Sequence, residues 1–320
     1  MQPVIETIRR IRMVNLLITG LFLSFFQYYI IIPVFQSASV PPGLDSLSFS
    51  LFLVSILCIA AGGNLWNDYS DYNLDVISKP DKGKSLSPRV MAISAQILIL
   101  TGTIIGIWLS VQAKQSYLIY FFMLSSLSLI LYSLILKSIP LIGNVVVALL
   151  CALPVVILVN LNYSSFEQNT LQFISAETEN SIRMVIRLQL IGYGGFAFLI
   201  NFIRELTKDI EDEAGDRMFH IQTFPVRFGI SAAKYLATFL MCTTMGLLSW
   251  LQWYIFTLDR TPRQFWYILF TVQFSLLIAV FSTLPVIRQK EMAFTNLFLK
   301  LIMLQGVLSI PLFFYWSKSL

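Results

Sequence analysis

Charge is scarce in this sequence, and that scarcity excludes most classes of protein. Asp, Glu, Lys and Arg make up only 12% of the 320 residues, against about a quarter in an ordinary soluble domain. Hydrophobic residues make up 57%, and the mean hydropathy is +0.75. A single water-facing globule could not bury so much apolar surface. A soluble enzyme, a disordered chain and a nucleic-acid-binding protein are therefore excluded, and the composition predicts an integral membrane protein.

Histidine and cysteine are also scarce, with one and three residues respectively. His220 is the only histidine, and although an imidazole can serve as a base, an isolated loop histidine is more often incidental. The three cysteines, Cys58, Cys151 and Cys242, lie far apart within apolar segments. Their spacing fits neither a disulfide framework nor a zinc site, so they are interpreted as small core side chains.

Long apolar segments fill most of the chain. A helix needs about 20 apolar residues to cross a hydrocarbon core of about 30 Å, and continuously apolar segments favour helices over a closed barrel. The first segment is longer than the apolar region of a signal peptide and is expected to be retained. The fold class is therefore all-α, with one membrane-embedded domain over residues 1–320 and nine transmembrane helices. The expected spans are 13–34, 47–66, 90–112, 116–136, 141–160, 188–206, 230–256, 265–286 and 293–316.

The loops between these spans differ in positive charge. Counted by alternate sides of the membrane, 16 Lys and Arg residues lie on the side of the N-terminus and six on the other. Because cytoplasmic loops carry the excess of positive charge, we expect a cytoplasmic N-terminus and a C-terminus on the opposite side. The longest opposite-side loop, 161–187, contains the glycosylation triplet that begins at Asn162, which has little weight by itself.

Acidic residues are concentrated in two short stretches on the expected cytoplasmic side. Ten of the 17 Asp and Glu residues lie between Asp68 and Asp81 or between Glu205 and Asp216. Both stretches contain the pattern D-x-x-D-x-x-x-D, with an offset of 141 residues, which indicates a weak internal repeat at 67–75 and 208–216. The two trios are Asp68, Asp71, Asp75 and Asp209, Asp212, Asp216.

Spacings of three and four residues place the members of a trio on one face of a helix. Three carboxylates on one stripe repel one another unless they share a cation. Oxygen ligands without nearby histidine or cysteine suit Mg²⁺, which leaves coordination positions for substrate phosphates. The two stretches are therefore predicted to bind a diphosphate through Mg²⁺. Glu211 and Glu213 lie off the stripe, so a role as solvated charges is equally compatible with the pattern.

Asn67-Asp68-x-x-Asp71-x-x-x-Asp75 and Lys208-Asp209-x-x-Asp212-x-x-x-Asp216 resemble the two Asp-rich motifs of the UbiA superfamily of intramembrane prenyltransferases. Further resemblance lies in Asn15, Tyr132, Lys137, Asn144 and the segment from Thr223 to Gly229. The resemblance covers nearly the whole chain. It implies nine helices around a central cavity, with two Mg²⁺ ions that bind an isoprenyl diphosphate at the cytoplasmic mouth and a prenyl tail in a lipid-open tunnel.

The resemblance also implies roles for individual residues. Seven are expected to bind metal: Asn67, Asp68, Asp71, Asp75, Asp209, Asp212 and Asp216. Asp71, Asp75, Asp212 and Lys137 are the candidate catalytic residues. The candidates for diphosphate binding are Asn67, Lys79, Lys82, Lys84, Arg89, Arg204, Lys208 and Tyr132. This chain departs from the family pattern after the first motif, where Lys79-Pro80 is followed by a different arrangement of basic residues, so Lys82, Lys84 and Arg89 all remain candidates for one role.

The sequence leaves more than one candidate for the molecule that accepts the prenyl group. The motif K-D-I-E-D-E-A-G-D and the I-x-K-P segment look most like digeranylgeranylglyceryl phosphate synthases, whose acceptor is geranylgeranylglyceryl phosphate. An aromatic quinone precursor of the dihydroxynaphthoate, hydroxybenzoate or homogentisate type is the alternative. A cation transporter is a remote third reading, because its carboxylates should lie near the bilayer midplane. The expected partners are an isoprenyl diphosphate, a lipophilic acceptor and the lipid bilayer, with no nucleic acid and no obligate protein partner.

Overall fold

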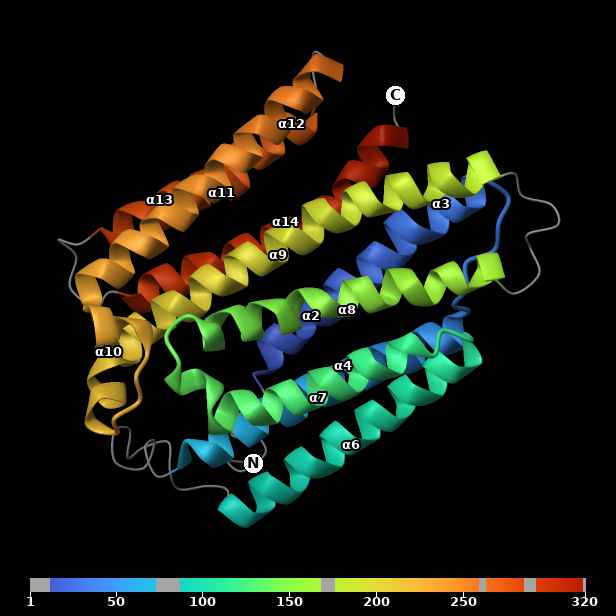
Figure 1. Ribbon diagram of the computed structural model, residues 1–320. Coiled ribbons are helices and arrows are strands. Elements are labelled where there is room, and N and C mark those ends of the chain that lie inside the picture. Colours follow the sequence, from blue (N-terminus) through green and yellow to red (C-terminus); the bar gives the residue numbers. More distant parts are fainter. Residues whose placement is uncertain (1–11, 73–86, 168–175, 259–262, 285–291, 319–320) are drawn as a thin grey trace, which may run out of the picture. The chain divides into compact units, whose positions relative to one another are not determined.

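The structure is a computed structural model that describes residues 12–72, 87–167, 176–258, 263–284 and 292–318 (Figure 1). Within these ranges the chain is helical and contains no strand. Nine helices in the described ranges are long and apolar enough to cross a membrane, which confirms the predicted number. They are Met13–Ser37, Ser46–Ser70, Pro88–Gln112, Tyr117–Leu134, Ile142–Ser165, Ala176–Met218, Ile230–Thr257, Arg263–Thr283 and Met292–Ser317.

The sixth span differs most from its prediction. Helix α9 (Ala176–Met218) has 43 residues, whereas the apolar segment predicts a helix over 188–206. At 1.5 Å per residue, α9 is about 65 Å long, roughly twice the thickness of a hydrocarbon core. The predicted loop over 161–187 is wrong for its described parts, because α8 (Ile142–Glu167) and α9 continue into it as helix. The second Asp-rich motif lies in the last turns of α9.

The chain divides into two compact units. Unit 1 comprises Met1–Leu136 and Leu153–Leu190. Its first span is built from α2 (Met13–Phe26), a π-helix η1 (Gln27–Ile31) and α3 (Ile32–Ser37). It also contains α4 (Ser46–Ser70), α6 (Pro88–Gln112) and α7 (Tyr117–Leu134), with parts of α8 and α9.

Helices α4 and α6 pack closely because each presents glycine to the other. A Cβ atom added to Gly62 of α4 would lie 2.9 Å from the Ala95 carbonyl oxygen of α6. A Cβ atom on Gly102 of α6 would lie 2.5 Å from the carbonyl oxygen of Ser55 on α4, whose hydroxyl donates to the Gly102 carbonyl at 2.6 Å. Small residues allow such close approach between membrane helices. Gly62 is therefore a packing residue, and the packing holds the helix that carries the first Asp-rich motif.

Two buried amides join distant segments of unit 1. Asn162 of α8 donates to the side-chain oxygen of Gln27 at 2.8 Å, and Gln27 donates back at 3.3 Å. The Asn162 side chain also accepts from the backbone N–H of Leu44 at 3.4 Å. Asn162 is fully buried, so the triplet that begins there is a packing element in this fold.

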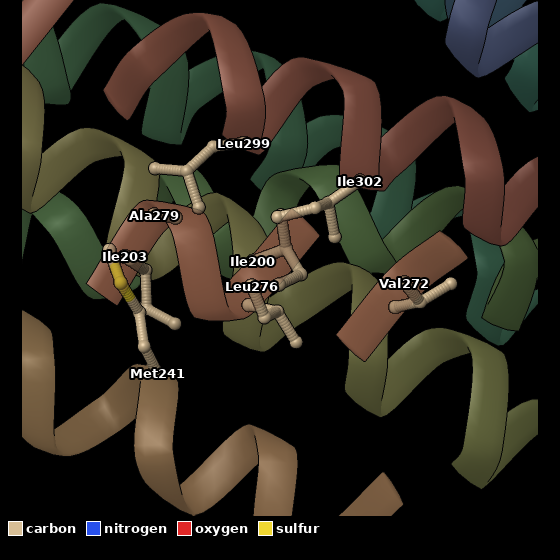
Figure 2. Close-up of a cluster of buried hydrophobic side chains, with 8 residues drawn as sticks. All are labelled: Ile200, Ile203, Met241, Val272, Leu276, Ala279, Leu299 and Ile302. Atoms are coloured by element: carbon tan, nitrogen blue, oxygen red, sulfur yellow. The ribbon is translucent and has the colours of Figure 1, made fainter. Parts of the chain in front are cut away.

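Unit 2 comprises Lys137–Ala152 and Ile191–Leu320. After the 3₁₀ turn η2 (Leu136–Ser138) and the start of α8, it contains the later part of α9, α10 (Phe224–Phe228) and α11 (Ile230–Leu258). Helix α12 (Arg263–Tyr267), the π-helix η4 (Ile268–Gln273), α13 (Phe274–Thr283) and α14 (Met292–Lys318) follow. Five of these helical segments, α9, α11, η4, α13 and α14, meet in an apolar cluster (Figure 2), formed by Ile200, Ile203, Met241, Val272, Leu276, Ala279, Leu299 and Ile302.

A second apolar cluster in unit 2 lies beside the Asp-rich end of α9. Leu206 and Ile210 of α9 pack with Ala233 and Ala237 of α11, and Leu141 packs against the same cluster. This cluster fixes the rotation of α9 at the turn that precedes the acidic stripe.

Candidate functional site

The first Asp-rich motif lies at the end of α4. Asn67 and Asp68 occupy its last turn, and Asp71 is the C-cap residue. The Asn67 amide donates to Oδ2 of Asp71 at 3.1 Å, so Asn67 orients the Asp71 carboxylate. The sequence predicts that Asp71 continues one helical stripe, whereas α4 ends at Ser70 and leaves Asp71 at the cap. Asp75 lies outside the described residues.

Most of the basic candidates near this motif cannot be placed, because Lys79, Lys82 and Lys84 lie outside the described residues. Arg89 lies in the first turn of α6 and is exposed. Tyr132 lies in the last turn of α7 and is half-buried. The choice among the three basic candidates for one role therefore stays open.

The second motif is wholly helical. Asp209, Asp212 and Asp216 all lie in α9 at the predicted spacings of three and four, so the prediction of one helical stripe is confirmed here. The two outer members accept hydrogen bonds from other elements. Asn144 near the start of α8 donates to Oδ2 of Asp209 at 2.7 Å, and the Thr223 hydroxyl donates to Oδ2 of Asp216 at 3.2 Å.

The acids of α9 outside the stripe have different partners. Glu211 accepts from the amide of Asn296 on α14 at 2.8 Å. Glu213 is buried and accepts from Nε of Arg217, one turn later, at 2.7 Å. Glu211 is thus linked to α14, whereas the Glu213 pair lies within α9.

The basic residues predicted for unit 2 lie in unequal environments. Arg204 is buried, lies 3.5 Å from the Glu205 carboxylate and donates to the Asn201 side chain at 3.4 Å. Lys208 is half-buried on α9, and Lys137 is half-buried in η2. Arg204 is therefore already engaged within the protein.

The donor atoms of the two motifs fit a hard divalent cation. They are carboxylate and amide oxygens, with no histidine or cysteine among them, as Mg²⁺ prefers. Among the residues that the structure describes, no three acidic, His or Cys side chains already gather around one point. Each motif therefore supplies few ligands by itself, which suits Mg²⁺, since it usually takes one or two carboxylates and completes its shell with water and phosphate.

Comparison with known proteins identifies the family of this chain. A model of the UbiA prenyltransferase family matches residues 29–302, a range that contains both Asp-rich motifs. The chain belongs to this family. A relative from Pyrococcus furiosus, digeranylgeranylglyceryl phosphate synthase, is 30% identical over 200 residues. That match covers 61% of this chain and 61% of the relative, so the chain matches about three fifths of the length of this UbiA relative.

Two solved structures show that the fold is that of UbiA proteins. The apo structure of a UbiA homolog from Aeropyrum pernix K1 has a TM-score of 0.61 at 13% identity, and the match covers 91% of this chain and 97% of the homolog. A UbiA homolog from Archaeoglobus fulgidus, bound to GPP and Mg²⁺, has a TM-score of 0.58 at 14% identity, with coverages of 96% and 99%. With nine apolar helices in the described ranges, family membership makes this chain an integral multi-pass membrane protein.

Sequence reasoning did not identify the partners of the acidic stripe. Asn144 and Thr223 appear in the sequence only as parts of segments that resemble the family, without a role. Asn144 and Asp209 are 65 positions apart in the sequence, whereas Thr223 and Asp216 are only seven positions apart. The Thr223 contact lies within reach of local sequence analysis, whereas the Asn144 contact depends on how α8 packs against α9.

Proposed function

We propose that this protein catalyses the Mg²⁺-dependent transfer of a prenyl group from an isoprenyl diphosphate to a lipophilic acceptor. The observation that carries the proposal is the pair of Asp-rich motifs, one of which begins in the last turn of the membrane helix α4 while the other lies in the last turns of α9, in a chain with little other acid. Membership of the UbiA prenyltransferase family and the GPP and Mg²⁺ bound by the Archaeoglobus fulgidus homolog support it.

In the proposed reaction, the allylic C–O bond of the prenyl diphosphate breaks, diphosphate departs, and an acceptor atom forms the new bond and loses its proton. Bound Mg²⁺ would supply positive charge where negative charge develops on the departing diphosphate. The proposed metal ligands are Asn67, Asp68, Asp71, Asp75, Asp209, Asp212 and Asp216.

The chain's own residues would bind and orient the diphosphate. Lys137 and Arg89 carry positive charge that can contact its oxygens. The Asn67 amide, which already donates to Asp71, keeps that carboxylate in one orientation. The apolar membrane segments would exclude water from the allylic cation, which would otherwise be quenched as an alcohol.

The active-site mouth is proposed to face the cytoplasm. The excess of Lys and Arg on the N-terminal side of the membrane supports this orientation, and both Asp-rich motifs follow spans that end on that side. The C-terminus would then lie on the opposite side.

Geranylgeranylglyceryl phosphate is the proposed acceptor. The second motif, K-D-I-E-D-E-A-G-D, and the Pyrococcus furiosus relative support this assignment. An aromatic quinone precursor is the alternative, because several branches of the family share the same two motifs.

Product analysis tests the proposal. Membranes that contain the protein are incubated with Mg²⁺, geranylgeranyl diphosphate and equal amounts of geranylgeranylglyceryl phosphate, dihydroxynaphthoate, homogentisate and hydroxybenzoate. Mass spectrometry should show digeranylgeranylglyceryl phosphate, and none when EDTA replaces Mg²⁺. Exclusive prenylation of an aromatic acid would refute the acceptor, and absence of any prenylated product would refute the activity. Membranes with an Asp212→Asn variant serve as the matched control.

A further inference from the structure

We infer that Asn144 and Thr223 are positioning residues that hold the two outer carboxylates of the α9 trio for metal binding. This inference rests on the proposed function and deepens it. Asn144 donates to Asp209 at 2.7 Å, and Thr223 donates to Asp216 at 3.2 Å. Both donors come from elements other than α9, so the stripe is held at its two ends from outside its own helix.

The contact from Thr223 replaces a more common use of a threonine at this position. Thr223 is the N-cap residue of α10, where a threonine hydroxyl usually accepts from a backbone N–H of the first helical turn. In α10 the Thr223 side chain makes no such capping bond. Its hydroxyl donates instead to Asp216. Thr223 is only 6% exposed, so its hydroxyl needs a partner within the protein. The Thr223 hydroxyl therefore binds the acidic stripe of α9 and does not cap α10.

The contact from Asn144 depends on a strained backbone. Leu141, directly before α8, has φ of +65°, in the left-handed region that costs a residue with a side chain about 1 kcal/mol. Its side chain packs against the apolar cluster that contains Leu206 and Ile210 of α9. This packing brings the first turn of α8 to the residue beside Ile210, where the 7% exposed Asn144 donates to Asp209. An amide does not titrate in the physiological range, so it donates at every pH at which the carboxylate is ionised.

These hydrogen bonds have a direct consequence for metal binding. Each occupies Oδ2 of its carboxylate and fixes the side-chain rotamer, so that Oδ1 points in one direction. Donors behind a ligating carboxylate commonly change metal affinity by about 10- to 100-fold when they are removed. Each hydrogen bond also opposes rotation of its carboxylate away from the neighbouring negative charge of Asp212.

Asn296 of α14 provides a control contact to the same helix, α9. It also donates an amide hydrogen bond, at 2.8 Å, to an acid of α9, but that acid is Glu211, which lies off the Asp stripe. Asn296→Leu and Asn144→Leu each remove one amide-to-carboxylate contact of nearly equal length, and Asn296→Leu also removes the acceptor of the buried Thr207 hydroxyl of α9, 2.7 Å away, so it disturbs α9 packing at least as much. A purely structural role predicts similar effects of the two variants, whereas the positioning role predicts that only Asn144→Leu weakens metal binding.

The test measures the Kd for Mn²⁺, used as a spectroscopic replacement for Mg²⁺, from the electron paramagnetic resonance signal of free Mn²⁺. The samples are the purified full-length protein and its variants in detergent, and melting in EDTA is recorded for each. We expect Asn144→Leu to raise the Kd about tenfold or more and Thr223→Val to raise it several-fold. Thr223→Ser retains the hydroxyl and should bind Mn²⁺ as the wild type does, as should Asn296→Leu. The Thr223 pair tests the inference even where Asn144→Leu fails to fold.

Two results would overturn the inference. Unchanged Mn²⁺ affinity in Asn144→Leu and Thr223→Val would show that the hydrogen bonds do not position ligands. Equal weakening by Asn296→Leu would show a general effect of α9 packing. Asp212→Asn separates failure of this inference from failure of the proposed function. If that variant also binds Mn²⁺ as tightly as the wild type, the proposed metal site itself is wrong.

Discussion

Replacement of Gly102 by alanine should destabilise the packing of α4 against α6. The new Cβ atom would lie 2.5 Å from the carbonyl oxygen of Ser55 and 2.8 Å from Cγ1 of Ile59. The first of these neighbours is backbone, so no side-chain rotation relieves the clash and the two helices must separate. Separation would also weaken the 2.6 Å hydrogen bond from the Ser55 hydroxyl to the Gly102 carbonyl.

The magnitude follows from two opposing effects. Overpacking of a well-packed contact costs typically 1–3 kcal/mol, and the backbone neighbour places this site near the upper end. Alanine recovers about 1 kcal/mol of helix propensity relative to glycine. We therefore expect Gly102→Ala to lose about 1–2 kcal/mol of stability, visible as a Tm lower by several degrees.

Gly192 provides the matched control for this substitution. It lies within α9, and a Cβ atom added there meets nothing within 4 Å. Gly192→Ala should therefore keep only the gain in helix propensity and leave the Tm equal or higher. Thermal unfolding of both variants in the same detergent measures the contrast. A Tm for Gly102→Ala equal to or above that of the wild type would refute the close-packing account of α4.

Three further predictions concern unit 1. Asp45→Ala should lower stability by about 1 kcal/mol, because the Asp45 carboxylate caps α4 by accepting from the Ser48 N–H at 2.8 Å. Hydrogen bonds from the Ser48 side chain and, second, from its N–H lower the pKa of Asp45. The stabilisation should therefore be present above the unfolded-state pKa and lost as the pH falls through the lower folded-state pKa, which melting curves of wild type and variant from pH 2 to 6 would show. Gln27→Leu should cost about 1–2 kcal/mol, because it leaves the buried Asn162 amide without its 2.8 Å acceptor, and an unchanged Tm would contradict this. Asn162 should remain unmodified in a glycosylating expression host, since its side chain is fully buried, and intact-protein mass would reveal an added glycan.

The positions of the membrane helices could be predicted because each requires a long apolar segment. The same criterion failed for the ends of α9, where Glu179 and Arg183 form an i,i+4 ion pair at 2.7 Å. Such pairs support a helix in water, but they lower hydropathy and make the segment resemble a loop. The length of a helix outside the membrane is therefore not visible in an apolar pattern.

The acidic stripe on α9 could be predicted because helical periodicity alone determines which residues share a face. On α4 the helix ends at Ser70 with Asp71 as its C-cap residue, so the stripe of the first motif is described only as far as Asp71. The contact between Asn144 and Asp209 depends on the packing of Leu141 against α9, which no local pattern encodes. Spacing thus identified the candidate ligands, and the folded packing identified what holds them.

Metal-dependent binding of radiolabelled geranylgeranyl diphosphate tests the central claim most directly. The purified protein should bind the diphosphate with Mg²⁺ and lose binding with EDTA. Asp71→Ala and Asp212→Ala, one in each motif, should each abolish binding, while Asn296→Leu should retain it. Undiminished binding in both Asp variants would contradict the assignment of the two Asp-rich motifs as the diphosphate site.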